Sequence, residues 1–286
     1  MWIADKWTDY ELLDAADGMR LERWGEYVLE RPDPQVIWKT QRRHPRWETP
    51  DASYRRSASG GGAWSEHSLP SSWTLGYGDL RFTVRPMNFK HTGLFPEQAV
   101  NWDAAGERIR ERIHRGKTVK LLNLFAYTGA STVACAKAGA AVTHVDAARG
   151  MVARARDNAA LNGVQARWIV EDCRRFLERE LRRGSRYDAV ILDPPSYGRG
   201  PVGEVWRLED DVYDLLDLIS QLLSDDAAFV FLSAYTAGLA PGVLTVLLDS
   251  VFTSRFGGRA EARELGIPIR GTSHILPCGA TGRWNR

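Results

Sequence analysis

Cysteine is scarce in this sequence. The chain has 286 residues, and its three cysteines, which show no CxxC spacing, are Cys135, Cys173 and Cys278. A fold that disulfide bonds stabilise needs several paired cysteines, and a zinc knuckle needs cysteines or histidines at short, regular spacings. His91, His144 and His274 are also isolated from one another in the sequence. We therefore expect reduced thiols and no metal site.

Long apolar runs are also missing. The longest purely apolar run has six residues, 227–232, whereas a membrane helix needs about 20. Near the N-terminus, Asp5 and Lys6 stand where a signal peptide would continue its apolar stretch. We expect neither a membrane span nor a secretory signal, and hence a cytoplasmic protein.

A strong excess of one charge is absent as well. Lysine and arginine number 38 and aspartate and glutamate 36, which gives a net charge of +2. Any affinity for nucleic acid must therefore come from local patches. With 44% hydrophobic and 26% charged residues, the composition is that of a globular protein. The length suits about two domains.

Residues 1–92 show the sequence pattern of a small β-rich domain. Aromatic residues and short runs of alternating apolar and polar residues are bounded there by residues typical of turns. Asp17-Gly18 and Gly78-Asp79 are candidate hairpin turns. The glycine-rich segment 55–63 is expected to be a mobile loop. In residues 38–56, cations alternate with aromatic side chains, a mixture that suits single-stranded RNA. We interpret residues 1–92 as a candidate RNA-binding domain.

From residue 93 onward, short apolar runs alternate with amphipathic stretches. The expected strands are 119–125, 141–146, 167–170, 187–192 and 228–233. The expected helices are 96–115, 131–138, 149–162, 173–183, 207–223 and 241–252. This alternation predicts an α/β fold with a parallel sheet covered by helices on both faces.

Polar groups follow four successive strands of this predicted sheet. The segment 121–130 is a strand that leads through a loop into a helix, without the GxGxxG or GK[ST] patterns of dinucleotide and P-loop sites. Asp146 and Asp172 end the next two strands, and residues 193–197 follow the fourth. Ligands bind at the carboxyl ends of such strands. A carboxylate such as Asp146 suits two ribose hydroxyls, so the pattern predicts a nucleoside-containing ligand.

These segments resemble the class I S-adenosylmethionine-dependent methyltransferases, and among them the bacterial large-subunit ribosomal RNA methyltransferases that modify cytosine carbon-5 or guanine N7. The resemblance covers about residues 90–286 and implies a Rossmann-like seven-stranded sheet. The segments that carry it are 92–98, 123–129, 145–146, 172–173 and 193–196. The cofactor residues that it implies are Gln98, Asn123, Phe125, Tyr127, Thr128, Gly129, Asp146, Asp172, Cys173 and Asp193. Of these, Gln98 and the 123–129 loop would surround the methionine moiety, Asp146 the ribose, and Asp172 the adenine.

The absence of a suitably placed cysteine predicts which type of atom accepts the methyl group. Methylation at cytosine carbon-5 requires a thiolate that first adds to the ring, and relatives that do this carry a cysteine after the fifth strand. Here residues 231–236 contain none. We therefore expect a nitrogen acceptor, with Asp193, Pro194 and Pro195 orienting the base and Tyr197 stacking on it.

Two alternatives stay open at the level of sequence. The cofactor half does not encode the acceptor, so the chain could instead methylate a protein or a small molecule. It could also be a non-catalytic RNA-binding protein that keeps a methyltransferase-like fold. The leading hypothesis is a methyltransferase that acts on RNA, in particular ribosomal RNA.

Overall fold

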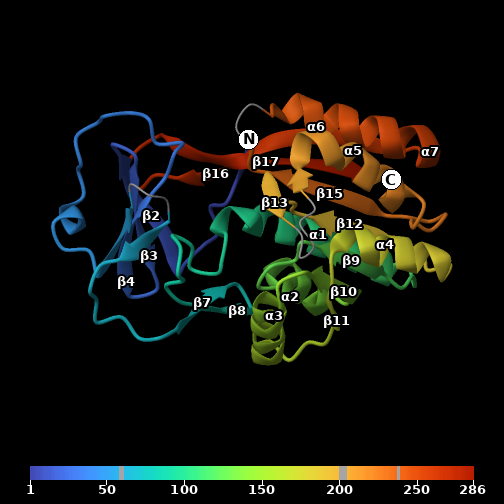
Figure 1. The fold of residues 1–286 in the computed structure, drawn as a ribbon, viewed down its shortest axis with the longest axis horizontal. Coiled ribbons are helices and arrows are strands. Elements are labelled where there is room, and N and C mark those ends of the chain that lie inside the picture. Colours follow the sequence, from blue (N-terminus) through green and yellow to red (C-terminus); the bar gives the residue numbers. More distant parts are fainter. Residues whose placement is uncertain (58–60, 200–204, 237–238) are drawn as a thin grey trace. The chain divides into compact units, whose positions relative to one another are not determined.

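The computed structural model describes residues 1–57, 61–199, 205–236 and 239–286, and the chain divides into two compact units (Figure 1). The first unit contains Val100–Glu264 and Gly279–Arg286, together with Met1, and the second contains Trp2–Ala99 and Leu265–Cys278. These units do not coincide with the ranges 1–92 and 93–286, because a late segment folds with the N-terminal part of the chain. In the second unit, Trp2 pairs with Leu265, and the Arg270 N–H donates to the Leu12 carbonyl at 2.9 Å.

The first unit is built on a sheet whose strand order is β16-β17-β15-β12-β9-β10-β11. Its parallel strands are β9 (Lys120–Leu124), β10 (Ala141–Asp146), β11 (Arg167–Val170), β12 (Ala189–Leu192) and β15 (Phe229–Ala234). Strand β17 (Ile275–Asn285) runs antiparallel to β15, and β16 (Arg259–Pro268) lies beyond it. The expected Rossmann-like α/β fold is confirmed. A short eighth strand, β1 (Trp2–Ile3), pairs with the part of β16 that belongs to the second unit.

Helices cover both faces of this sheet. They are α1 (Ala99–His114), α2 (Ala130–Lys137), α3 (Arg149–Leu161), α4 (Cys173–Arg182), α5 (Leu208–Ser220), α6 (Pro241–Leu248) and α7 (Ser254–Phe256), with a π turn at Asp249–Thr253. Side chains alternate across a strand. Leu122 and Leu124 therefore pack into the cluster formed with α4, α5 and α6, whereas Leu121 packs into the cluster formed with α1 and α2. Burial on both faces explains the continuous apolar runs of the parallel strands.

The second unit contains a five-stranded sheet and a separate hairpin. The sheet has the order β2 (Tyr10–Ala16), β3 (Met19–Trp24), β4 (Tyr27–Pro32), β5 (Ala52–Arg56), β6 (Gly62–Trp64), and the hairpin is β7 (Trp73–Tyr77) with β8 (Leu80–Val84). One-turn 3-10 helices lie at Pro45–Trp47 and Pro96–Gln98. Asp17 and Gly18 turn between β2 and β3 with φ of 51° and 76°. Left-handed residues at both central positions match the twist of the strands, and both expected hairpins are confirmed.

The glycine-rich segment differs from its expected form. Arg55 pairs with Ala63, and Arg56 pairs with Gly62, so the two ends of the segment belong to the antiparallel strands β5 and β6 rather than to an irregular loop. A Cβ atom at Gly62 would lie only 2.3 Å from the Arg55 carbonyl oxygen. Glycine is therefore needed for the strands to approach closely. The central residues 58–60 of the expected mobile loop lie outside the described residues.

Candidate functional site

Four polar segments of the first unit gather at one edge of its sheet. Strands β11, β10, β9 and β12 are neighbours and parallel, so their carboxyl ends lie side by side. The loop 125–129 follows β9, Asp146 ends β10, Asp172 comes just after β11, and Asp193 follows β12. Parallel α/β sheets bind their ligands at this edge. The edge is therefore the candidate site of this unit.

The loop between β9 and α2 has an unusual backbone. Phe125 and Tyr127 adopt φ angles of 52° and 51°, in the left-handed region that non-glycine residues rarely occupy. The Tyr127 N–H donates to Asp146 Oδ2 at 2.8 Å, and the Ala126 N–H donates to the Val145 carbonyl at 3.1 Å. Such strain persists where the surrounding contacts enforce it, and it gathers at ligand sites. Here Asp146 supplies one of the enforcing contacts.

Asp146 is the central carboxylate of the site. Besides the bond from Tyr127, its Oδ1 accepts the Ala148 N–H at 2.8 Å. Burial raises the pKa of Asp146, and the two backbone hydrogen bonds oppose that shift. A carboxylate offers about four acceptor positions. Each oxygen of Asp146 can thus keep its backbone hydrogen bond and still accept a hydroxyl group from a ligand.

Asp172 and Cys173 begin helix α4. Asp172 Oδ1 caps the helix by accepting the Arg175 N–H at 3.0 Å, which leaves Oδ2 as the oxygen suited to a ligand. The Cys173 thiol is buried, and its Sγ accepts the Phe125 N–H at 3.4 Å. Val170, the last residue of β11, is 43% exposed. An exposed valine beside an acid suits a flat, partly apolar ring with an amino group. Sequence analysis missed Val170, although its place directly before Glu171-Asp172 was an available signal.

Three expected site residues pack in or against the loop. The buried Asn123 donates through Nδ2 to Thr132 Oγ1 at 2.8 Å, and the carbonyl of the buried Thr128 accepts from Asn158 Nδ2 at 2.9 Å. At Gly129, a Cβ atom would lie 2.7 Å from Ala155 Cβ of α3. The structure thus places these residues in the packing that shapes the loop. The Asn123 Nδ2 donor is engaged inside the fold, and the expected contact of Asn123 with a ligand stays a prediction.

Gln98 belongs to a different unit. It is buried at the end of the 3-10 helix Pro96–Gln98, in the second unit, whereas the loop and the strand ends belong to the first. Its expected contact with the ligand therefore stays a prediction.

The Pro-Pro segment after β12 is held by a tryptophan. Trp206 Nε1 donates to the Pro195 carbonyl at 2.6 Å, and its ring centroid lies 5.6 Å from that of Phe125. Trp206 stands on β14 (Val205–Arg207), which pairs with β13 (Tyr197–Arg199). Sequence analysis missed this residue, and only its aromatic character near the Pro-Pro segment could have indicated it. Trp206 joins the segment to the loop after β9.

The expected acceptor-side residues differ in exposure. Pro194 is buried, Asp193 is half-buried, and Tyr197 is 51% exposed. Ser196 Oγ accepts the Thr236 hydroxyl at 2.7 Å, which ties the segment to the residues that follow β15. The geometry presents an acid and an aromatic ring on a segment fixed at two points.

The three cysteines are all buried. Cys135, Cys173 and Cys278 are 0%, 2% and 8% exposed. Burial raises the pKa of Cys135 to about 12 and holds the pKa values of Cys173 and Cys278 far above that of an ordinary thiol. Since the thiolate is the nucleophilic form, none of the three is placed to attack a substrate.

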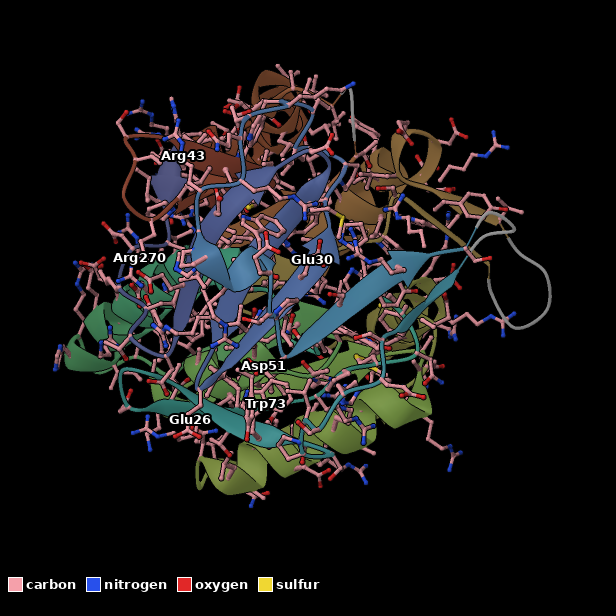
Figure 2. The ribbon with its side chains drawn as sticks, turned by 90° about the vertical axis from the view of Figure 1, so that its left-hand side faces the viewer. Glu26, Glu30, Arg43, Asp51, Trp73 and Arg270 are labelled. Carbon is pink, nitrogen blue, oxygen red and sulfur yellow. The ribbon has the colours of Figure 1, made fainter. Side chains whose placement is uncertain are left out.

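The run of cations and aromatic residues in the second unit is partly structural. The Arg42 guanidinium lies 4.3 Å from the centroid of the Trp47 ring and 3.5 Å from Glu30, and Arg46 pairs with Asp51 at 2.7 Å. Figure 2 labels both acids. These two arginines therefore hold their own unit together. The expectation that residues 38–56 bind RNA stays a prediction.

The described ranges contain neither a metal-ligand cluster nor a membrane helix. Within them, no group of three histidine, cysteine, aspartate or glutamate side chains is arranged to hold a metal ion. The helices of the same ranges include none that is long and apolar enough to cross a membrane.

Comparisons with known proteins identify a family for this chain. The sequence model of a family described as S-adenosylmethionine-dependent methyltransferases matches residues 40–239. The ribosomal RNA large subunit methyltransferase K/L of Allochromatium vinosum is 32% identical over 209 residues, which is 71% of this chain and 26% of the relative. The protein of that name from Shewanella sp. strain MR-4 is 30% identical over 55% of this chain and 22% of its own length. The chain thus spans about a quarter of these curated relatives.

Solved structures give the same result over the whole chain. The S-adenosylmethionine-dependent methyltransferase of Agrobacterium tumefaciens is 33% identical, with a TM-score of 0.92 over 99% of this chain and 92% of that one. A methyltransferase structure from Streptococcus mutans, at 18% identity, has a TM-score of 0.75 over 99% and 76% of the two chains and shows the shared fold alone. The resemblance inferred from the sequence is confirmed. The chain belongs to the S-adenosylmethionine-dependent methyltransferases, and S-adenosylmethionine is its cofactor.

Proposed function

We propose that this methyltransferase transfers the methyl group to a nitrogen atom of an RNA nucleobase, and that its substrate is ribosomal RNA. The names of the curated relatives support an RNA substrate. The chain spans only about a quarter of the length of those relatives. Their substrate is therefore a proposal for this chain. Action on ribosomal RNA would place the protein in the cytoplasm.

The residues at the sheet edge fit S-adenosylmethionine. We assign Asp146 to the two ribose hydroxyls, because each of its oxygens already accepts only one backbone N–H. Asp172 Oδ2 and the exposed Val170 side chain suit the adenine amine and ring, with the buried Cys173 packing behind them. Phe125 and Tyr127 lie on the strained loop that would face the methionine moiety. When bound, the cofactor supplies a methyl group that its sulfonium has already activated.

Positioning is then the main task of the acceptor side, since the reacting atoms must approach to about 3–3.5 Å in line. We assign Asp193 and the Pro194 carbonyl to accept N–H groups from a base, and Tyr197 to stack on its ring. Pro195 is fixed by Trp206 and orients the segment. An exocyclic amine would be held by these acceptors. A guanine N7, which carries a lone pair and no proton, would need only stacking and alignment.

The observation that carries the choice of nitrogen is the burial of every thiol. Cytosine carbon-5 becomes nucleophilic only after a thiolate adds to the ring. All three cysteines of the chain are at least 92% buried, and burial raises the pKa of each one. A ring nitrogen or exocyclic amine needs no such adduct. The structure therefore favours nitrogen over carbon-5.

Transfer of a labelled methyl group tests the proposal. The purified chain is incubated with methyl-labelled S-adenosylmethionine and a cell extract that contains unmethylated ribosomal RNA. We expect label in the RNA fraction, removable by ribonuclease, and N-methylated nucleosides after digestion. Label that stays in protein or in small molecules would contradict the RNA proposal.

A cysteine-free variant tests the choice of acceptor atom. We expect the combined variant Cys135→Ala, Cys173→Ala and Cys278→Ala to keep most of its turnover, because no thiol takes part in the chemical step. Each substitution removes a buried sulfur atom and should destabilise the fold by roughly 1 kcal/mol, so single variants and thermal melting serve as controls. Loss of turnover in folded Cys278→Ser, together with a covalent adduct on RNA containing 5-fluorocytosine, would restore the carbon-5 mechanism.

A further inference from the structure

The second unit contains a cavity of about 420 Å³ that the proposed methyl-transfer chemistry does not use. This volume lies in the range of pockets that bind small molecules, about 300–1,000 Å³. Apolar and aromatic side chains, a cation and a histidine line it, among them Trp38, Arg43, Ile269, His274, Ile275 and Pro277. All of its lining residues belong to the second unit. The cavity is a candidate binding site of its own.

Trp38 gives the cavity a fixed aromatic wall. Its indole N–H donates to the Ala15 carbonyl at 2.7 Å, and the side chain is half-buried. This bond fixes the ring, so little side-chain freedom is lost when a ligand stacks on it. Ile269, Ile275 and Pro277 add apolar surface. A flat ring with polar edges, such as a nucleobase, matches this lining.

Asp14 stabilises the lining of the cavity rather than offering a site for a cation. Its carboxylate accepts the backbone N–H groups of Ala15, Arg43 and His44 at 2.9, 2.8 and 3.3 Å, and the indole N–H of Trp47 at 2.8 Å. Burial acts to raise the pKa of Asp14, but these hydrogen bonds outweigh it and lower the pKa. The ionised carboxylate is therefore occupied by donors of its own unit, and it anchors the backbone of Arg43.

Arg43 differs from its neighbours Arg42 and Arg46. Arg42 and Arg46 pair with acids, whereas the exposed guanidinium of Arg43 makes no ion pair with any residue that the structure describes. Figure 2 shows Arg43 at the periphery of the view, apart from the labelled Glu30 and Asp51. A fixed backbone and an uncompensated cation at the cavity suit an anionic group. A phosphate is the anion that accompanies a nucleobase in RNA.

We propose that this cavity binds one unpaired nucleotide of the RNA substrate, with its base on Trp38 and its phosphate at Arg43. Stacking on an aromatic ring with a cation at the backbone is how proteins hold single-stranded RNA. The inference rests on the proposed function, because it takes the substrate to be RNA. It adds a recognition site whose residues are different from the methyl-transfer residues and belong to the second unit, whereas the methyl-transfer residues belong to the first.

Binding of a fluorescent single-stranded RNA, measured by anisotropy over a series of salt concentrations, tests the proposal. Removal of one stacked base contact corresponds to a loss of about 5- to 150-fold, which is the effect expected of Trp38→Ala. Trp38→Phe keeps an aromatic ring and should recover part of that loss. Arg43→Ala should weaken binding and flatten the slope of log affinity against log salt by about 0.7.

Lys39→Ala is the matched control, since Lys39 is an exposed neighbour that does not line the cavity. Its removal changes the charge as much as Arg43→Ala does, and it should leave affinity unchanged. Binding of S-adenosylmethionine, which we assign to the first unit, verifies that each variant is folded. Ultraviolet crosslinking of wild-type protein to RNA containing 4-thiouridine adds a readout that needs no variant. We expect crosslinks within residues 38–43 or 269–277.

The outcomes separate this inference from the proposed function. The wild-type protein could bind and methylate RNA while Trp38→Ala and Arg43→Ala bind it equally well. This result would overturn the cavity proposal and leave the methyltransferase proposal intact. Crosslinks confined to other segments would have the same meaning, even if a variant fails to fold. Wild-type protein that neither binds nor methylates RNA would overturn both.

Discussion

Replacement of Asp146 by alanine is expected to weaken the binding of S-adenosylmethionine by about 10- to 150-fold. The ribose hydroxyls would lose a charged acceptor, which corresponds to ~1.5–3 kcal/mol. The Tyr127 and Ala148 N–H groups, which Asp146 now accepts at 2.8 Å, would lose their partner too. The loop would then lose one contact that enforces its left-handed residues. Isothermal titration calorimetry measures the change directly.

The control for this experiment is Asp157→Ala. Asp157 is exposed on α3 and carries the same charge, so its removal should leave the affinity unchanged. Because burial raises the pKa of Asp146, wild-type affinity should also fall as the pH drops through that raised value. The same fall should be absent from Asp146→Ala. Unchanged affinity in a folded Asp146→Ala variant would remove this residue from the cofactor site, and tighter binding of a nicotinamide dinucleotide would overturn the cofactor assignment.

The substitution Glu22→Gln is expected to destabilise the fold by about 3–5 kcal/mol, the usual effect of breaking a buried ion pair. Glu22 is fully buried in the second unit, where its carboxylate accepts the Tyr10 hydroxyl at 2.7 Å and Arg31 Nε and Nη2 at 2.6 and 2.8 Å. Arg20, whose side chain is 11% exposed, lies 3.5 Å away. A neutral amide would leave the guanidinium groups of Arg31 and Arg20 without their shared counter-charge. Urea unfolding measures the loss.

The pH dependence of stability gives this prediction a second readout. Burial opposes ionisation of Glu22, but Arg20 and Arg31 outweigh it and lower its pKa from 4.5 to about 2. The unfolded state therefore binds the proton first. The stabilisation is fully present above about pH 4.5 and is lost as the pH falls toward 2. Glu26→Gln, on an exposed glutamate labelled in Figure 2, is the control. Equal stability of the two variants would contradict the account of this cluster.

The parallel core could be predicted from the sequence because each strand there is a short apolar run between polar turns. The strands 141–146 and 167–170 have the predicted bounds. The C-terminal strands β16 and β17 were not predicted. Pro277 and Gly279 interrupt β17, and both residue types are depleted in strands. The pairing of β17 with β15 overrides that local preference. No local sequence pattern reveals this pairing.

The site could be predicted only in part for a similar reason. That Asp146 and Asp193 lie at the carboxyl ends of parallel strands of one sheet follows from the order of the elements, which the sequence pattern shows. The inward direction of the Asn123 amide depends on Thr132, which lies on a different element. The bond from Trp206 to Pro195 joins residues eleven positions apart through the pairing of β13 with β14. Such contacts are set by tertiary packing, which spacing along the chain does not reveal.

Mass-spectrometric mapping of methylated nucleosides in RNA tests the central claim most directly. RNA from cells that lack this chain is compared with RNA from the same cells after they regain the wild-type chain or an Asp193→Ala variant. The account predicts that one N-methylated nucleoside of ribosomal RNA disappears and returns only with the wild-type chain. Loss of 5-methylcytosine instead, or RNA methylation that does not depend on the chain, would contradict it.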